Sequence, residues 1–219
     1  MTAFAKTYFS PGERVPAGLL VSSYLFGTVM LGFGLVDGFV YLTALHLVFT
    51  TVLLAWTHRP KPSARLYLWL AACFTVGWLA EYVGVHGGWL FGEYVYGDVL
   101  GPKVAGIPIV IGVNWILVVY AVCGSLNFLD ARVPRVAKAL VGAAALVALD
   151  ALIEPVAIRL DYWTWAQGDP PLQNFVGWFG VGLLQTALFY LLIPYTHNRL
   201  SPVLLALQLV FFAFLSITL

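Results

Sequence analysis

Three carboxyl side chains, Glu81, Asp150 and Glu154, lie within stretches of sequence that are otherwise almost entirely apolar. An ionisable group inside a membrane-spanning helix costs roughly 2.5–3.5 kcal/mol on insertion scales, so each is a candidate functional residue. Carboxyls that share a poorly solvated site cannot all ionise, and we expect at least one to hold its proton at neutral pH and to serve as a general acid. The alternative is that each acid pairs with Lys103, Arg159 or a tryptophan N–H and only fixes helix packing.

The spacing of the acids predicts that they face one another. Asp150 and Glu154 are four residues apart, so they share one face of a helix and lie about 6 Å apart along its axis. Asp150 is the deepest of the three, roughly 12 Å below the end of its span. Glu81 lies near the end of a different apolar stretch. We therefore expect the three carboxyls to converge on one cavity near one end of a helical bundle.

The composition shows which kind of element carries these acids. Hydrophobic residues make up 61% of the 219 residues, charged residues only 10%, and the mean hydropathy is +0.90, which excludes an ordinary soluble domain. Because lipid cannot satisfy exposed backbone groups, helices of about 20 apolar residues are expected. The sequence predicts an all-α integral membrane protein, a single polytopic domain over residues 1–219 with about seven spans. The spans are Pro16–Val36, Phe39–Trp56, Leu66–Gly84, Ile107–Leu126, Val136–Ile158, Val176–Tyr195 and Pro202–Leu219.

Basic residues fall almost entirely in alternate loops, and this predicts the orientation. Nine of the eleven lie on one predicted side and only Lys103 and Arg159 on the other. The positive-inside rule then places the N-terminus in the cytoplasm and the C-terminus outside. The acids gather toward the outer side, which favours a water-accessible polar site there; the alternative is that acids drift outward when bases are held inside. The nine inner basic residues are Lys6, Arg14, Arg59, Lys61, Arg65, Arg132, Arg135, Lys138 and Arg199.

Two outer loops, His86–Gly106 and Arg159–Phe175, resemble each other. Each follows an acid near a helix end and continues through aromatic-x-aromatic, proline, asparagine and tryptophan. This order predicts a parallel repeat of two helical hairpins, the third with the fourth span and the fifth with the sixth, about an axis along the membrane normal. The alternative is a chance similarity between two aromatic loops.

Polar and aromatic side chains near the acids are the candidates for substrate binding. Asn114 lies inside the fourth span, where it either joins helices or positions substrate or water. Asn174 is expected to N-cap the sixth span. The aromatic residues fit an interfacial belt, although some of them are placed to line the acid pocket and to stabilise a cation with their ring faces. These aromatic residues are Trp78, Trp89, Tyr94, Tyr96, Trp115, Trp163, Trp165 and Trp178.

Cysteines and histidines give no indication of a metal site. Cys73 and Cys123 lie inside predicted spans and are expected to be buried free thiols. The four histidines lack ligand spacing, so no metal is predicted.

A series of short motifs, in order, resembles a family of carotenoid biosynthesis membrane proteins that includes carotenoid 1,2-hydratases and bisanhydrobacterioruberin hydratases. The resemblance covers about residues 75–180. This chain has Glu154 before a proline where the family usually has aspartate, and residues 169–173 lack the family's usual stretch before the asparagine. The matching motifs are Glu81-x-x-Gly84, Phe91-Gly92-x-Tyr94-x-Tyr96, Leu100-Gly101-Pro102, Gly106-Ile107-Pro108, Asn114-Trp115, Asp150-x-x-x-Glu154-Pro155-x-Ala157, Trp163-x-Trp165 and Asn174-Phe175-x-Gly177-Trp178.

The resemblance implies hydration of the terminal C1=C2 double bond of an acyclic carotenoid. Asp150, as the deepest acid, is expected to protonate C2, while Glu81 and Glu154 orient water and balance the charge of the tertiary cation. No cofactor is required. The expected partners are a carotenoid that enters from lipid, water and membrane lipids, with no nucleic acid. The chain would be an integral protein of a bacterial or archaeal cytoplasmic membrane.

Two alternatives stay open at this point. A carotenoid cyclase begins with the same protonation, but an internal alkene captures the cation, so its pocket must be dry. A carotenoid- or lipid-binding protein would use the same acids only to hold helices together. A prenyltransferase is disfavoured, because Asp150-x-x-x-Glu154 alone is too weak a motif for magnesium diphosphate.

Overall fold

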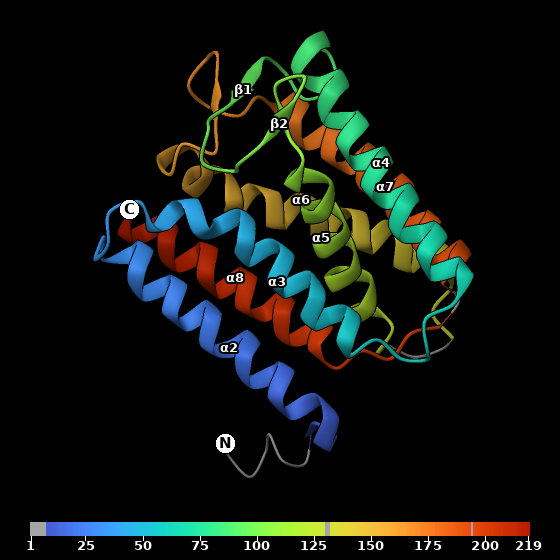
Figure 1. Ribbon diagram of the computed structural model, residues 1–219. Coiled ribbons are helices and arrows are strands. Elements are labelled where there is room, and N and C mark those ends of the chain that lie inside the picture. The colour runs from blue at the N-terminus through green and yellow to red at the C-terminus, as the bar shows by residue number, and fades with distance from the viewer. Residues whose placement is uncertain (1–7, 130–131, 194) are drawn as a thin grey trace.

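The computed structural model describes residues 8–129, 132–193 and 195–219, and it is a bundle of apolar helices (Figure 1). Six of its helical segments are long and apolar enough to cross a bilayer, and α5 is a shorter apolar helix. The prediction of about seven helices is therefore confirmed. The helices are α2 (Pro11–Gly32), α3 (Thr43–Trp56) preceded by the 3-10 turn η1 (Phe39–Leu42), α4 (Ala64–Gly87), α5 (Val110–Leu126), α6 (Arg135–Arg159), α7 (Leu172–Leu192) and α8 (Leu200–Thr218).

Several predicted helix ends were wrong, each for a local reason. The first span ends at Gly32 and not at Val36, because the chain turns through Gly34 and Gly38, both at positive φ. The sixth begins at Leu172, directly after the extended Pro171, and not at Val176. The fourth begins at Val110 and not at Ile107, because Ile107–Pro108 is a strand.

Helix α5 occupies the centre of the bundle. It packs against α3, α4, α6, α7 and α8, and every residue from 117 to 124 is buried. A helix that is apolar on all sides is expected to be surrounded by protein. The α4–α5 contact is close because of Gly77: a Cβ added there would lie 2.4 Å from the Trp115 ring.

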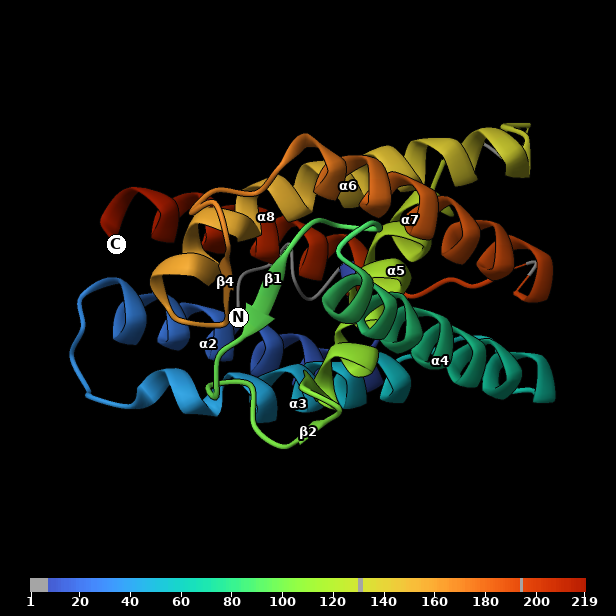
Figure 2. The same ribbon diagram turned by 90° about the horizontal axis from the view of Figure 1, so that it is seen from above.

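Two small pairs of strands close one end of the bundle. β1 (Tyr94–Tyr96) pairs antiparallel with β4 (Trp163–Trp165), with Tyr94 opposite Trp165 and Tyr96 opposite Trp163. β2 (Lys103–Val104) pairs with β3 (Ile107–Pro108) through a two-residue turn, Ala105-Gly106, in which both residues have positive φ. The β1–β4 pairing joins the two loops whose similar sequences predicted the repeat, and these loops lie side by side in the structure (Figure 2).

The arrangement agrees with the proposed repeat but does not establish it. α4 packs against α5 and α7, and α6 packs against α7 and α5, as a two-fold axis between the hairpins would require. The repeat stays a prediction.

The two ends of the bundle differ in charge, and this generates a test of orientation. The beginnings of α4, α6 and α8 lie at one end, and the β1–β4 strands lie at the other (Figures 1 and 2). Arg135 is exposed at the first end. At the second, Asp98 is 92% exposed and pairs with Lys103 at 2.6 Å. The lysine lowers the pKa of the Asp98 carboxyl.

We expect Asp98→Cys to react with a membrane-impermeant thiol reagent from outside the cell, and Arg135→Cys to react only after the membrane is opened. Gly97 is unsuitable for this assay, because a Cβ there would lie 2.1 Å from the Asp161 carbonyl oxygen. The native cysteines are buried and provide the unlabelled control. Labelling in the reverse order would contradict the orientation.

Candidate functional site

Glu81, in the last two turns of α4, is buried and accepts three hydrogen bonds. Its Oε2 accepts from the hydroxyls of Tyr94 (2.5 Å) and Tyr96 (2.8 Å), and its Oε1 accepts from Trp115 Nε1 (3.1 Å). The strand β1 places both phenols on the same side, because residues two apart along a strand face the same way. Gly84 leaves room for this contact: a Cβ there would lie 2.8 Å from the Tyr94 hydroxyl.

Glu154, near the end of α6, has a matching set of donors. Its Oε2 accepts from Trp163 Nε1 (3.0 Å) and Trp165 Nε1 (2.8 Å), and its Oε1 accepts from Asn174 Nδ2 (3.2 Å). As with Glu81, two donors come from the aromatic-x-aromatic strand that follows its own helix. A third comes from the next helix of the same hairpin.

Asp150 lies behind this arrangement and is fully buried. Its Oδ2 accepts a hydrogen bond from Asn174 Nδ2 at 2.8 Å, and its Oδ1 has no hydrogen-bond partner among the described residues. The expectation that Asn174 caps its helix was wrong: Pro171 is at the N-cap position, and the Asn174 amide reaches inward to both acids of α6. One amide therefore couples Asp150 to Glu154.

Glu81 and Glu154 line the same cavity of about 30 Å³. Two of the three predicted acids thus lie in the wall of one cavity. Asp150 is linked to Glu154 through Asn174, the hydrogen-bond donor that they share. Trp115 and Trp178 lie in its wall as a stacked pair with ring centroids 4.4 Å apart. The other lining residues are Phe91, Tyr94, Tyr96, Ile111, Asn114, Trp163, Trp165 and Asn174.

Two of the predicted aromatic residues lie outside this cavity. Trp78 stacks on Tyr82, with ring centroids 5.9 Å apart, and Trp89 is 68% exposed. Both fit the interfacial-belt interpretation.

The two phenols of β1 are held as hydrogen-bond donors. Burial, and then the charge of Glu81, raise the pKa of Tyr94 and Tyr96 above the ordinary phenol value. Both hydroxyls therefore keep their protons at neutral pH and can donate to the carboxyl of Glu81.

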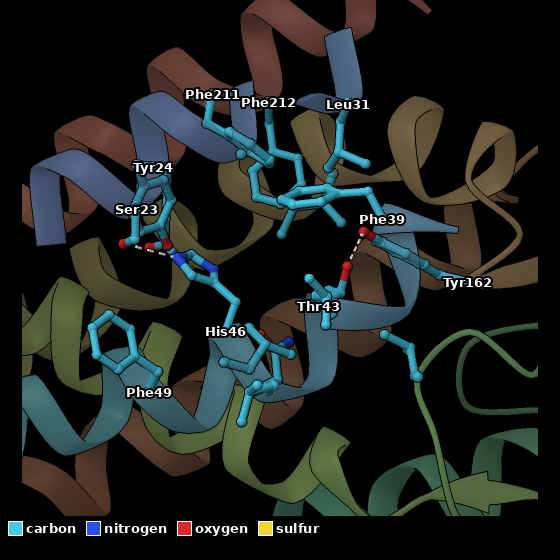
Figure 3. Close-up of a pocket in the computed structure, with 18 of the residues that line it drawn as sticks. Ser23, Tyr24, Leu31, Phe39, Thr43, His46, Phe49, Tyr162, Phe211 and Phe212 are labelled. Atoms are coloured by element: carbon cyan, nitrogen blue, oxygen red, sulfur yellow. Dashed lines mark hydrogen bonds between the residues drawn. The ribbon is translucent and has the colours of Figure 1, made fainter. Parts of the chain in front are cut away.

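Asn114 lies at the junction of two cavities. It is partly buried, and its side-chain amide makes no hydrogen bond to any of the described residues. It contacts the acid cavity and also a larger chamber of about 400 Å³ between α2, α3, α5 and α8, shown in Figure 3. A polar side chain without a protein partner here is free to bind water or a ligand.

The large chamber could not be predicted from the sequence. Its wall is built from apolar residues such as Phe39 and Phe212, which are indistinguishable in the sequence from lipid-facing residues. Among the polar residues that α2 and α3 contribute to the chamber is an ionisable one, His46, which is hydrogen-bonded to Ser23 at 3.1 Å. A histidine within a predicted span was the available signal.

Removing one indole donor should destabilise the fold around Glu154. We expect Trp165→Phe to lower the free energy of unfolding by about 1.5–3 kcal/mol, because a buried carboxyl loses a donor. Thermal unfolding of the purified protein in detergent measures this. Trp89→Phe removes the same N–H from an exposed ring and is the matched control; equal melting temperatures for the two variants would contradict the assignment.

Comparisons with known proteins show which family the chain belongs to. Residues 40–219 match a family model described as carotenoid biosynthesis protein. Bisanhydrobacterioruberin hydratase from Haloarcula japonica is 32% identical over 136 residues, which is 59% of this chain and 46% of that protein, so the chain matches less than half of that relative's length. No solved structure matches the chain. Because the family model covers most of its length, the chain belongs to the carotenoid biosynthesis protein family.

Proposed function

We propose that the protein hydrates the terminal C1=C2 double bond of an acyclic carotenoid, using the two carboxyls that line the small cavity. The observation that carries this proposal is the pair Glu81 and Glu154, each with three hydrogen-bond donors, facing one cavity inside a membrane bundle. Family membership and the similarity to a hydratase support the reaction class.

The donors around the two acids suggest different roles for them. Glu81 receives two phenol hydroxyls on one oxygen and an indole N–H on the other, a set that favours the anion. Glu154 receives as many donors, but its Oε1 shares Asn174 Nδ2 with the buried carboxyl of Asp150, and two carboxyls so close together cannot both ionise. We assign the proton to the Asp150–Glu154 pair. In this proposal Glu154, and not Asp150 as expected from the sequence, is the direct donor, because Glu154 lines the cavity whereas Asp150 is not among the lining residues.

The reaction then needs only the carotenoid and water as reactants. The Glu154 proton adds to C2 as the π electrons form the new C–H bond, and the positive charge develops on the tertiary C1. The Glu81 anion and the faces of Trp115 and Trp178 stabilise that cation. Water attacks C1, the resulting oxonium gives its extra proton to Glu81, and transfer back to Glu154 restores the starting state.

The cavity has room for the water that hydration needs. A volume of about 30 Å³ accommodates about two water molecules when each requires roughly 10–15 Å³. Asn114 lies in its wall with an unused amide, which we assign to holding the attacking water. A cyclase would need the same cation in a cavity without water, so the polar lining favours hydration.

Variants of the acids test the proposal in a host that accumulates lycopene. We expect the wild-type protein to add one water to a carotenoid end. Glu154→Gln, Asp150→Asn and Glu81→Gln should each lose about 10²–10⁴-fold in hydration rate, the usual contribution of acid–base groups. Mass analysis of the extracted pigments measures the products.

Asp98→Asn is the control, because it removes an exposed carboxylate paired only with Lys103. A pigment of unchanged mass but altered structure would favour the cyclase. Near-normal hydration by Glu154→Gln would exclude Glu154 as the proton donor. Near-normal hydration by Asp150→Asn would exclude a proton shared between Asp150 and Glu154.

A further inference from the structure

The acid cavity is too small to hold a carotenoid, so the rest of any such substrate must lie elsewhere. Its volume of about 30 Å³ is room for about two water molecules. The larger chamber adjoins it directly, since Ile111, Asn114 and Trp163 line both. A chain whose end reaches the acids past these three residues would therefore have the rest of its length in the chamber or beyond it.

The chamber wall suits a hydrocarbon. Leu31, Phe39 and Phe212 point into it in Figure 3. Four of its polar side chains are paired with one another: Ser23 with His46 at 3.1 Å, and Thr43 with Tyr162 at 2.9 Å. Asn114 and the Oε1 of Gln208 have no hydrogen-bond partner among the described residues, but apolar side chains outnumber the polar ones in the wall. Burial of apolar surface is therefore the chamber's main source of affinity.

The chamber opens sideways between α2 and α3. Three apolar residues line the chamber here: Phe26 on α2, Leu42 directly before α3, and Leu45 on α3. Their exposed fractions are 55%, 50% and 65%, respectively. In a membrane-spanning bundle, exposed apolar residues at this depth face lipid. A hydrophobic molecule can therefore enter from the bilayer without crossing water.

We infer that this chamber binds the polyene chain of the substrate next to its reacting end, and that the chain enters from lipid between α2 and α3. The inference rests on the proposed function for the identity of the ligand. It adds a binding compartment, built from helices far from the acids in sequence, and a route of entry. A lipid acyl chain is the competing occupant.

Gly27 on α2 gives a direct way to fill the chamber. It lines the chamber, and a Cβ there would meet only Phe211, at an ordinary 3.7 Å, so a larger side chain projects into open space. Gly18 on the same helix is exposed and has nothing within 4 Å of a Cβ, and it does not line the chamber. Gly27→Phe and Gly18→Phe are therefore a matched pair.

Binding is measured by the quenching of tryptophan fluorescence when lycopene is titrated into purified protein in lipid nanodiscs. We expect Gly27→Phe to weaken binding by at least about tenfold, which is about 1.4 kcal/mol, while Gly18→Phe and Gly27→Ala bind like the wild type. Binding by Gly27→Phe equal to that of the wild type would overturn the inference and leave the chamber to lipid. If Gly27→Phe does not fold, Gly27→Cys with and without a bulky maleimide provides the same comparison.

Hydration of a short isoprenoid separates this inference from the proposed function. An acyclic isoprenoid with the same end group but without the polyene should be hydrated equally by the wild type and Gly27→Phe, because it needs only the acid cavity. Loss of that activity in Gly27→Phe would show damage to the acid site and overturn the chamber assignment. If the wild type binds lycopene, Gly27→Phe does not, and neither hydrates any substrate, the proposed function fails while the chamber assignment holds.

Discussion

A carboxyl group buried among apolar helices must receive hydrogen-bond donors from the protein, and this requirement organises much of the end of the bundle that carries β1 and β4. Glu81 and Glu154 come from different hairpins, and each is met by two aromatic donors from the strand that follows its helix. Those strands, β1 and β4, pair with each other, so the donors of one acid are fixed against the donors of the other. The pairing holds both carboxyls against one cavity. Without this pairing, hydrogen bonds would not offset the desolvation cost of burying two carboxyls in one site.

In the proposed reaction, two connected spaces would hold different parts of a hydrophobic substrate. The acid cavity is small and lined by carboxyls and aromatic rings, while the chamber is larger and mostly apolar. Asn114 lies where they meet. Under the proposed function, a cation would form where carboxylates and ring faces surround it, while the apolar chain would stay out of water. The central helix α5 supplies Ile111 and Asn114 to both spaces.

The sequence predicted the helices, the convergence of Glu81 with Glu154, and most of the aromatic lining, because each has a local signal: apolar length, an acid within a span, or an aromatic-x-aromatic repeat. It did not predict the pairing of Tyr94 with Trp165, since strand partners far apart in a chain leave no local pattern. It assigned Asn174 to a helix cap because asparagine favours that position, whereas the buried acids of α6 attract its amide more strongly. The chamber was invisible because apolar residues that line a cavity and those that face lipid have the same composition.

The central claim is that the acids deliver a proton to one carbon and that water, not an internal alkene, captures the cation on the next. Isotope labelling tests it most directly: the wild-type protein is supplied with lycopene in water enriched in oxygen-18, and separately in heavy water, and the product is analysed by mass spectrometry with fragmentation. The account predicts one oxygen-18 on the tertiary carbon and one deuterium on its neighbour for each end that reacts. Deuterium without oxygen-18 would contradict hydration and identify a cyclisation, and a product with neither label would contradict acid catalysis altogether.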